Sequence, residues 1–149
     1  SYSVPLIIND RVDIALAVEA EGVHIGQKDL PLEQVRKIVP ESMIVGVSAS
    51  TIEEGKKAER EGADYLGIGA VFPTGTKQDA KVLPEGMLER VAQSVSIPSV
   101  AIGGIDLQNV SSIIGKNISG VAVVSSIMQA ENPKQAAEQY RKLLSGSHL

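Results

Sequence analysis

Residues 44–68, IVGVSASTIEEGKKAEREGADYLGI, contain one complete strand–helix–strand unit of the expected fold. The apolar run at 44–47 does not alternate with polar residues, which is typical of a strand buried on both faces. Ser50 or Thr51, followed by two glutamates, is a plausible helix start. Gly62 separates the helical pattern at 51–61 from the next apolar run at 65–68, where a left-handed helix end is expected.

The same unit recurs along the whole chain. We expect strands at residues 5–8, 23–25, 44–47, 65–68, 99–102 and 121–124, and helices at 11–19, 32–39, 51–61, 84–95, 109–115 and 133–144. Gly22 and Gly120 are expected to end helices as Gly62 does. Strict alternation predicts an α/β fold with a parallel sheet. An open doubly wound sheet and a (β/α)8 barrel both fit this pattern, although six units are two fewer than a barrel needs.

Composition excludes several functional classes. The chain has 149 residues, 43% of them hydrophobic and only 3% aromatic, so an aliphatic core is expected and disorder is not. The net charge of −4 argues against a general nucleic-acid surface. No apolar run reaches the roughly 18 residues that a membrane span needs. The absence of cysteine excludes disulfides and a thiol nucleophile and is compatible with the cytoplasm, where we expect the protein to act.

The chain is expected to form one domain. No linker rich in proline or serine and no low-complexity segment interrupts it, so the domain is predicted at residues 1–144. Residues 145–149, SGSHL, have the composition of a flexible tail that does not belong to the domain.

Polar residues follow the expected strands, at the edge where parallel α/β folds bind ligands. Asn9 and Asp10 follow the first strand, Asp29 follows the second, and Ser48 follows the third. Asp10 and Asp29 could together hold Mg²⁺, which prefers a few carboxylates completed by substrate phosphates. The alternative is that each aspartate caps the helix after its strand.

Two further segments suit an anionic ligand. Residues 74–77, Thr-Gly-Thr-Lys, offer two hydroxyls, a flexible backbone and an ammonium group on a long loop, although a solvated loop is the alternative. Gly103-Gly104 and Ser125-Ser126 follow the last two expected strands, as in the phosphate site common in barrels. Turn glycines and serine caps are the alternative there.

His24 lies inside an expected strand, between Val23 and Ile25. A histidine in this position is more often a core residue with satisfied hydrogen bonds than a catalyst, and we expect that here. The sequence contains no arrangement of Ser, His and Asp typical of nucleophilic catalysis.

Taken together, the motifs closely resemble the thiamine phosphate synthase family, whose members are (β/α)8 TIM barrels. The resemblance covers nearly the whole chain, in order. Its most diagnostic segments are Asn9-Asp10-Arg11 and Phe72-Pro73-Thr74-Gly75-Thr76-Lys77. The other matching segments are residues 6–8, 22–27, 46–48, 62–65, 101–105 and 120–125.

The resemblance implies a magnesium-dependent transferase. The family joins hydroxymethylpyrimidine diphosphate to thiazole phosphate, giving thiamine phosphate and pyrophosphate by a dissociative mechanism. It implies that Asp10 and Asp29 hold Mg²⁺, that Asn9 and Lys77 contact the diphosphate, and that Ser48 contacts the pyrimidine. It also assigns residues to the thiazole phosphate: Thr74, Gly75, Thr76, Gly104, Val124 and Ser125. Among these residues the catalytic roles fall to Lys77, Ser48 and Asn9.

The resemblance further implies that the six units correspond to strands three to eight of the barrel. The family's Gln-x-Arg-x-Lys motif, which also binds the diphosphate, belongs to an earlier strand and has no match here. A complementary N-terminal segment or a second copy of the chain would then be a partner.

Two alternatives to the synthase remain. One is a truncated, non-catalytic fragment that binds phosphate ligands or assembles with a partner segment. The other is a thiazole tautomerase, which the presence of Ser48-Ala49-Ser50 disfavours because such relatives carry a histidine in this stretch.

Overall fold

The computed structural model describes residues 2–146 and contains one parallel sheet of six strands in the order β1-β2-β3-β4-β5-β6. The strands are β1 (Ile7–Asn9), β2 (Gly22–Ile25), β3 (Ile44–Ala49), β4 (Tyr65–Ile68), β5 (Ser99–Ile102) and β6 (Gly120–Ala122). The helices are α1 (Val12–Ala17), α2 (Leu32–Ile38), α3 (Ile52–Arg60), α4 (Met87–Gln93), α5 (Ser125–Met128) and α6 (Pro133–Ser145), with a 3₁₀ helix, η1, at Val110–Ser112.

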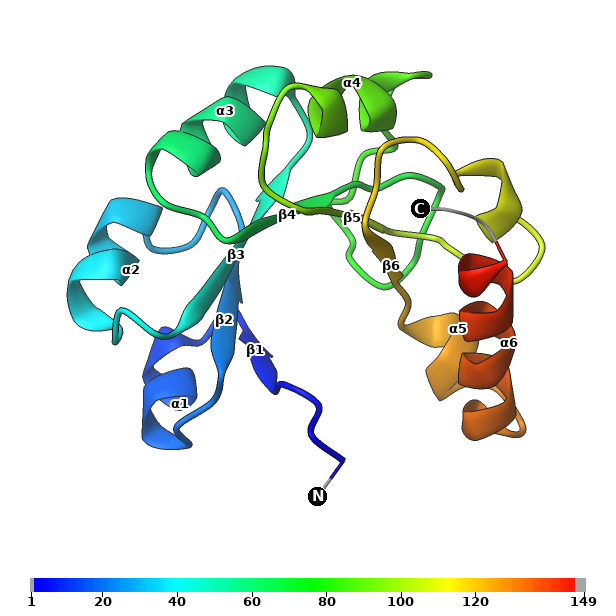
Figure 1. The fold of residues 1–149 in the computed structure, drawn as a ribbon, viewed down its shortest axis with the longest axis horizontal. Helices are drawn as coiled ribbons and strands as arrows, with labels where there is room; N and C mark the ends of the chain where they lie inside the picture. Colours follow the sequence, from blue (N-terminus) through cyan, green and yellow to red (C-terminus); the bar gives the residue numbers. More distant parts are fainter. Residues whose placement is uncertain (1, 147–149) are drawn as a thin grey trace.

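The sheet curves, and the helices α1 to α4 lie along its outer side (Figure 1). Each strand pairs with the next one in the sequence, so the strands form a half-barrel with β1 and β6 as its two edges. This confirms the α/β class and the parallel sheet, and it excludes the open doubly wound order, in which the strand sequence reverses.

The core is aliphatic, as the composition predicts. Val23, Val45, Leu66 and Ile68 of the central strands are fully or almost fully buried. α3 turns a small residue, Gly55, toward β4, and a Cβ atom built there would lie 3.2 Å from the Leu66 side chain. Small residues on the helix therefore let it pack close to the sheet.

Local sequence signals set two of the helix starts. The Thr51 hydroxyl accepts a hydrogen bond from the Glu54 backbone N–H at 3.1 Å, and the Glu54 carboxylate accepts one from the Ser50 backbone N–H at 2.7 Å. Asn132 likewise caps α6, with Pro133 in the first turn. Both starts agree with the sequence patterns, and the capped helix at α3 is stabilised by about 1 kcal/mol.

Several predicted elements are wrong in extent. The predicted helix at 109–115 is only η1. Asp106 and Asn109 cap its start by accepting from each other's backbone N–H groups, but the bonds that follow are of the 3₁₀ type, from Ser112 N–H to the Asn109 carbonyl and from Ile113 N–H to the Val110 carbonyl, and Gly115 turns to a φ of +82°. Gly22 and Gly120 lie inside β2 and β6 rather than ending helices, whereas Gly62 adopts the expected left-handed φ of +94°.

The ends of the elements differ in smaller ways. The helix predicted from residue 84 begins at Met87, and β3 continues to Ala49, so Ser48 lies within the strand rather than after it. Asn9 is likewise the last residue of β1. α6 includes Ser145, so the predicted tail begins later than residue 145, and residues 147–149 lie outside the described part of the chain. No helix among residues 2–146 is long and apolar enough to cross a membrane.

We predict that Leu66→Ala lowers the free energy of unfolding by about 2–5 kcal/mol, because Leu66 is completely buried in the middle of the sheet. Urea denaturation followed by circular dichroism measures this loss. Ile38→Ala is the matched control, since Ile38 is 54% exposed on α2 and should cost about 0.5 kcal/mol. Equal losses in the two variants would contradict the position of the core.

Candidate functional site

The loops that follow the strands meet at the carboxyl edge of the sheet. Asp10 follows β1, Asp29 follows β2, Lys77 lies in the loop after β4, and Gly104 follows β5. Parallel pairing places all these strand ends at the same edge, so residues far apart in the sequence can act on one ligand.

The carboxylates of Asp10 and Asp29 lie close to each other. Burial raises the pKa of Asp10 above its usual value, a hydrogen bond to Asp29 and the Asp29 charge raise it further, and the positive charge of Lys77 lowers it. The Asp29 carboxylate is also held by the Gly26 backbone N–H at 2.6 Å. Two carboxylates and one ammonium group therefore form a small charged cluster.

Neither aspartate caps a helix. The residue that precedes α1 is Arg11 and the one that precedes α2 is Pro31, and in both cases the side chain makes no capping hydrogen bond. Asp10 instead adopts a left-handed φ of +66° and donates its backbone N–H to the His24 carbonyl at 2.8 Å. This bond holds the Asp10 backbone next to β2, beside Asp29.

The donor set fits Mg²⁺ rather than a metal held entirely by protein. Residues 2–146 contain no group of three or more His, Cys, Asp or Glu side chains that could enclose a metal ion. A pair of adjacent carboxylates is what Mg²⁺ uses when substrate phosphates and waters complete its shell. Burial is the main cause of the raised Asp10 pKa and the Asp29 charge adds to it, and a divalent cation would offset the effect of that charge.

The long loop between β4 and α4 brings Lys77 to this cluster. Lys77 is exposed, and its charge lowers the pKa of both Asp10 and His24, which places it near both side chains. The neighbouring Asp79 carboxylate lies 3.4 Å from the Lys28 ammonium group, so the loop also contacts the segment that carries Asp29.

The same loop lines a hollow of about 460 Å³ on the side of β5 and β6. The hollow combines loop, glycine and serine residues from three segments of the chain. Its lining residues are Pro73, Thr74, Gly75, Gly104, Ile105, Asp106, Ser125, Ser126, Gln129 and Ala130. The structure therefore brings together Thr74, Gly75, Gly104 and Ser125 of the predicted ligand residues, whereas Thr76 and Val124 lie beside lining residues but do not line the hollow themselves.

Gly104 is required by the geometry of this hollow. Its φ is +65°, and a Cβ atom there would lie 2.4 Å from the Pro73 carbonyl oxygen. The Asn109 side chain donates a hydrogen bond to the Gly104 carbonyl at 2.9 Å. Asn109 was not predicted as a site residue, and only its place in the Asp106–Asn109 turn could have indicated it.

Ser48 is held from two sides. Its backbone carbonyl accepts a hydrogen bond from the Gln27 side chain at 2.8 Å, and its hydroxyl lies 2.8 Å from Nε2 of His24. Nδ1 of His24 lies 2.9 Å from the Tyr65 hydroxyl. Burial lowers the pKa of His24, Lys77 lowers it further, and Asp29 raises it. His24 is therefore hydrogen-bonded on both nitrogens, as expected, but it lies at the site rather than in the apolar core.

Glycines on the central strands make room for the two rings. His24 pairs with Gly46, and Gly46 pairs with Tyr65. A Cβ atom on Gly46 would overlap the Tyr65 ring, and a Cβ atom on Gly67 would lie 2.9 Å from the His24 ring. No role is predicted from the sequence for Tyr65 or Gln27, although a histidine, a tyrosine and two glycines on adjacent buried strands were the available signal.

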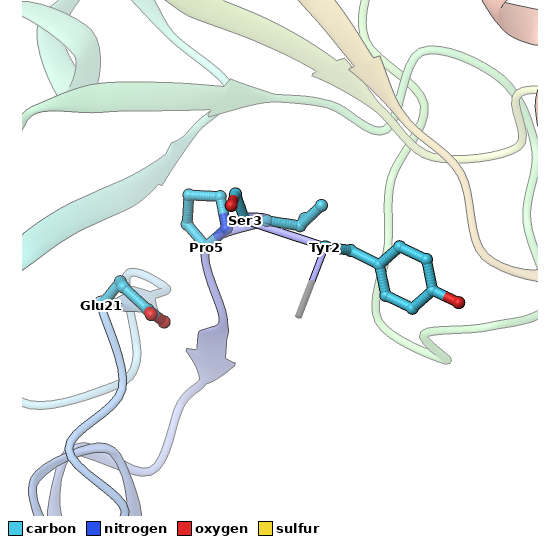
Figure 2. A pocket seen from close by; sticks show the side chains of 5 residues that line it. Tyr2, Ser3, Pro5 and Glu21 are labelled. Atoms are coloured by element: carbon cyan, nitrogen blue, oxygen red, sulfur yellow. The ribbon is translucent and has the colours of Figure 1, made fainter.

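A second hollow, of about 520 Å³, lies at the start of the described chain and is lined by Tyr2, Ser3, Val4, Pro5 and Glu21. Figure 2 shows the Tyr2 ring pointing away from Pro5 and Glu21. The Glu21 carboxylate is already engaged by the Leu6 backbone N–H at 2.7 Å. The predicted site residues all lie elsewhere.

These features define a parallel α/β protein of the half-barrel type, with charged and polar loop residues gathered at the carboxyl edge of its sheet. The family model for thiamine monophosphate synthase matches residues 1–127. The chain belongs to the thiamine monophosphate synthase family.

Individual relatives agree with this assignment. The chain is 57% identical over 138 residues to thiamine-phosphate synthase of Clostridium tetani, covering 93% of this chain and 66% of the relative. It is 54% identical over 141 residues to that of Methanobrevibacter smithii, covering 95% and 68%. The solved thiamine phosphate pyrophosphorylase from Pyrococcus furiosus superposes with a TM-score of 0.90 at 43% identity, covering 97% of this chain and 69% of that one. The chain thus spans about two thirds of the length of these relatives.

We predict that Gly104→Ala destabilises the fold and weakens the affinity for inorganic phosphate at least tenfold, because the methyl group forces the β5 loop away from Pro73. The left-handed φ alone costs about 1 kcal/mol. Thermal unfolding and calorimetric titration with phosphate measure the two effects. Gly120→Ala is the matched control, since a Cβ atom there meets nothing within 4 Å and Gly120 does not line the hollow. Unchanged phosphate affinity in Gly104→Ala would contradict this site.

Proposed function

We propose that this chain carries the substrate site of a thiamine phosphate synthase. The reaction couples hydroxymethylpyrimidine diphosphate to thiazole phosphate and releases pyrophosphate. Membership of the family supports the proposal, and the relatives that match over about two thirds of their length are named for this activity. The composition, which lacks cysteine, is compatible with a reaction in the cytoplasm.

One observation supports the proposal: the loop after β4 reaches both the charged cluster and the hollow. Its Lys77 acts on the Asp10–Asp29 cluster, and its Thr74 and Gly75 line the hollow that also contains Gly104. Two phosphorylated substrates that must react with each other need two such sites side by side. The charged cluster suits the diphosphate and the hollow suits the monophosphate.

The chemistry needs charge stabilisation more than proton transfer. As the carbon–oxygen bond of the pyrimidine diphosphate breaks, its electron pair leaves with pyrophosphate. The lone pair of the thiazole nitrogen then forms the new carbon–nitrogen bond, so no general base is required. Lys77 stabilises the negative charge that grows on the leaving oxygen, and Asn9, the last residue of β1 and the neighbour of Asp10, binds the same group.

Mg²⁺ bound by Asp10 and Asp29 would supply further neutralisation of the diphosphate. Ser48 positions the pyrimidine. Thr74, Thr76 and the backbones of Gly75, Gly104, Val124 and Ser125 bind and orient the thiazole phosphate. The second substrate is thereby held against the reacting carbon, which removes much of the entropic cost of the coupling.

We also infer that the half-barrel forms units three to eight of a closed eight-unit barrel. The solved relative matches 97% of this chain with only 69% of its own length. The outer edges of β1 and β6 pair with no strand among residues 2–146. An N-terminal segment with two strand–helix units would close the barrel between these edges, and a second copy of the chain is the other candidate for covering them.

The second candidate function is binding of phosphate ligands without catalysis. The open edges and the partial coverage of the relatives favour it for the chain taken alone. One experiment distinguishes catalysis from binding alone. Calorimetric binding of both substrates without formation of thiamine phosphate would support the second candidate.

We predict that Lys77→Ala reduces the rate of thiamine phosphate formation at least a hundredfold with little change in melting temperature, because Lys77 is an exposed side chain at the charged cluster. A coupled assay of thiamine phosphate with saturating Mg²⁺ measures the rate. Lys81→Ala is the matched control, an exposed lysine of the same loop, and should retain full activity. Equal activity of Lys77→Ala and the wild type would show that the loop has been assigned wrongly.

We predict that Asp10→Asn weakens Mn²⁺ binding in the presence of pyrophosphate at least tenfold without lowering the melting temperature. The Asp10 pKa is raised by burial and by Asp29, so the charged form opposes folding at neutral pH, and a neutral amide relieves this repulsion. Electron paramagnetic resonance titration of Mn²⁺ measures the affinity. Asp13→Asn, at the exposed Arg11–Asp13 pair, is the control and should bind as the wild type does.

A further inference from the structure

A chain of hydrogen bonds crosses the three central strands beside the charged cluster. It runs from the Tyr65 hydroxyl on β4 to Nδ1 of His24 on β2, at 2.9 Å, and from Nε2 of His24 to the Ser48 hydroxyl on β3, at 2.8 Å. None of its members needs to carry charge. The positions of the protons along these hydrogen bonds decide whether the Ser48 hydroxyl acts as a hydrogen-bond donor or as an acceptor toward a ligand.

Only two proton orders are possible while His24 is neutral. In the first, Tyr65 donates to Nδ1, Nε2–H donates to Ser48, and the Ser48 proton is free. In the second, Ser48 donates to Nε2, Nδ1–H donates to Tyr65, and the Tyr65 proton needs another acceptor. The first order leaves a free donor at Ser48, whereas the second leaves a free donor at Tyr65.

The surroundings of Tyr65 favour the first order. The Tyr65 side chain is partly buried over Gly46, and burial raises the pKa of its hydroxyl, so the proton stays on the oxygen. His24 is the only hydrogen-bond partner of the Tyr65 hydroxyl among residues 2–146. The second order would leave the phenolic proton without an acceptor among residues 2–146, and the first would leave the Ser48 proton in that state. The first order is favoured because Ser48 lies two residues nearer the carboxyl edge of the sheet than Gly46, over which the Tyr65 ring lies, so the Ser48 proton is nearer the edge where a ligand can accept it.

We propose that Tyr65 and His24 are positioning residues that fix the Ser48 hydroxyl as a hydrogen-bond donor to the ligand. Two further contacts limit the movement of Ser48: its carbonyl accepts from Gln27, and its strand is paired on both sides. The site therefore selects an acceptor atom, such as an unprotonated nitrogen of an aromatic ring, over a donor such as an amino group.

The identity of the ligand rests on the proposed function, under which the pyrimidine ring supplies this acceptor. The proton order does not rest on it, because the contacts that set it lie within the protein. A failure of the proposed function and a failure of this inference can therefore be told apart.

The test is the tautomer of His24 in the ligand-free chain at pH 8. Two-bond ¹H–¹⁵N correlation spectra of the imidazole distinguish a proton on Nε2 from a proton on Nδ1. The sequence contains only His24 and His148, so His148→Ala assigns the signals. We expect the Nε2–H tautomer in the wild type. A Nδ1–H tautomer would overturn the proposal, even in a chain that forms thiamine phosphate.

Tyr65→Phe tests the role of the chain of bonds. The Phe ring fills the same space over Gly46 but no longer donates to Nδ1, so we expect a mixture of tautomers. In the coupling reaction we expect at least a fivefold rise in KM for the pyrimidine diphosphate, with the KM for thiazole phosphate unchanged. Tyr2→Phe, with Tyr2 97% exposed, is the control and should match the wild type in both.

Two outcomes contradict the positioning role. One is a Tyr65→Phe variant that keeps the pure Nε2–H tautomer. The other is an equal rise in both KM values, which would indicate a general loss of structure. An Nε2–H wild type that forms no thiamine phosphate would support the proton order and refute the proposed function.

Discussion

The register of β2, β3 and β4 is the constraint on which the site depends. His24 pairs with Gly46, and Gly46 pairs with Tyr65, so the three residues lie at one level of the sheet with their side-chain positions on the same face. The glycine between them leaves the space that the Tyr65 ring fills. A slip of one residue between β2 and β3 would move His24 to the face opposite Ser48, and a slip between β3 and β4 would move Tyr65 to the face opposite His24.

The same register governs the charged part of the site. Asp10 is held beside β2 through its bond to the His24 carbonyl, and Asp29 is held by Gly26 at the end of that strand. Burial and, after it, the neighbouring Asp29 raise the pKa of Asp10, so ionised Asp10 destabilises the folded chain at neutral pH. The burial of the apolar core offsets the cost of placing two carboxylates side by side. Such a pair is suited to a site that binds a cation.

The sequence predicts those parts of the fold that depend on neighbouring residues. The Thr51 and Asn132 helix starts, all six strands and the gathering of the strand ends follow from local patterns. The helix predicted at 109–115 is only η1, because the turn that Asp106 and Asn109 cap continues with 3₁₀ bonds and Gly115 adopts a φ of +82°. The contact between His24 and Tyr65 could not be predicted, because it depends on the register of three strands. The pattern of apolar residues within each strand does not specify that register.

The positions of the charged groups determine which residues of the site act through charge and which act by orienting other groups. Lys77 and Asp29 act on His24 in opposite directions, and burial disfavours its charged form, so the ring is suited to remain neutral with both nitrogens bonded. A reaction in which the leaving group departs with its electron pair and a nitrogen lone pair attacks requires no proton acceptor. In such a site a histidine orients neighbouring groups and does not transfer protons. The charged side chains that act on the substrates come from the loops.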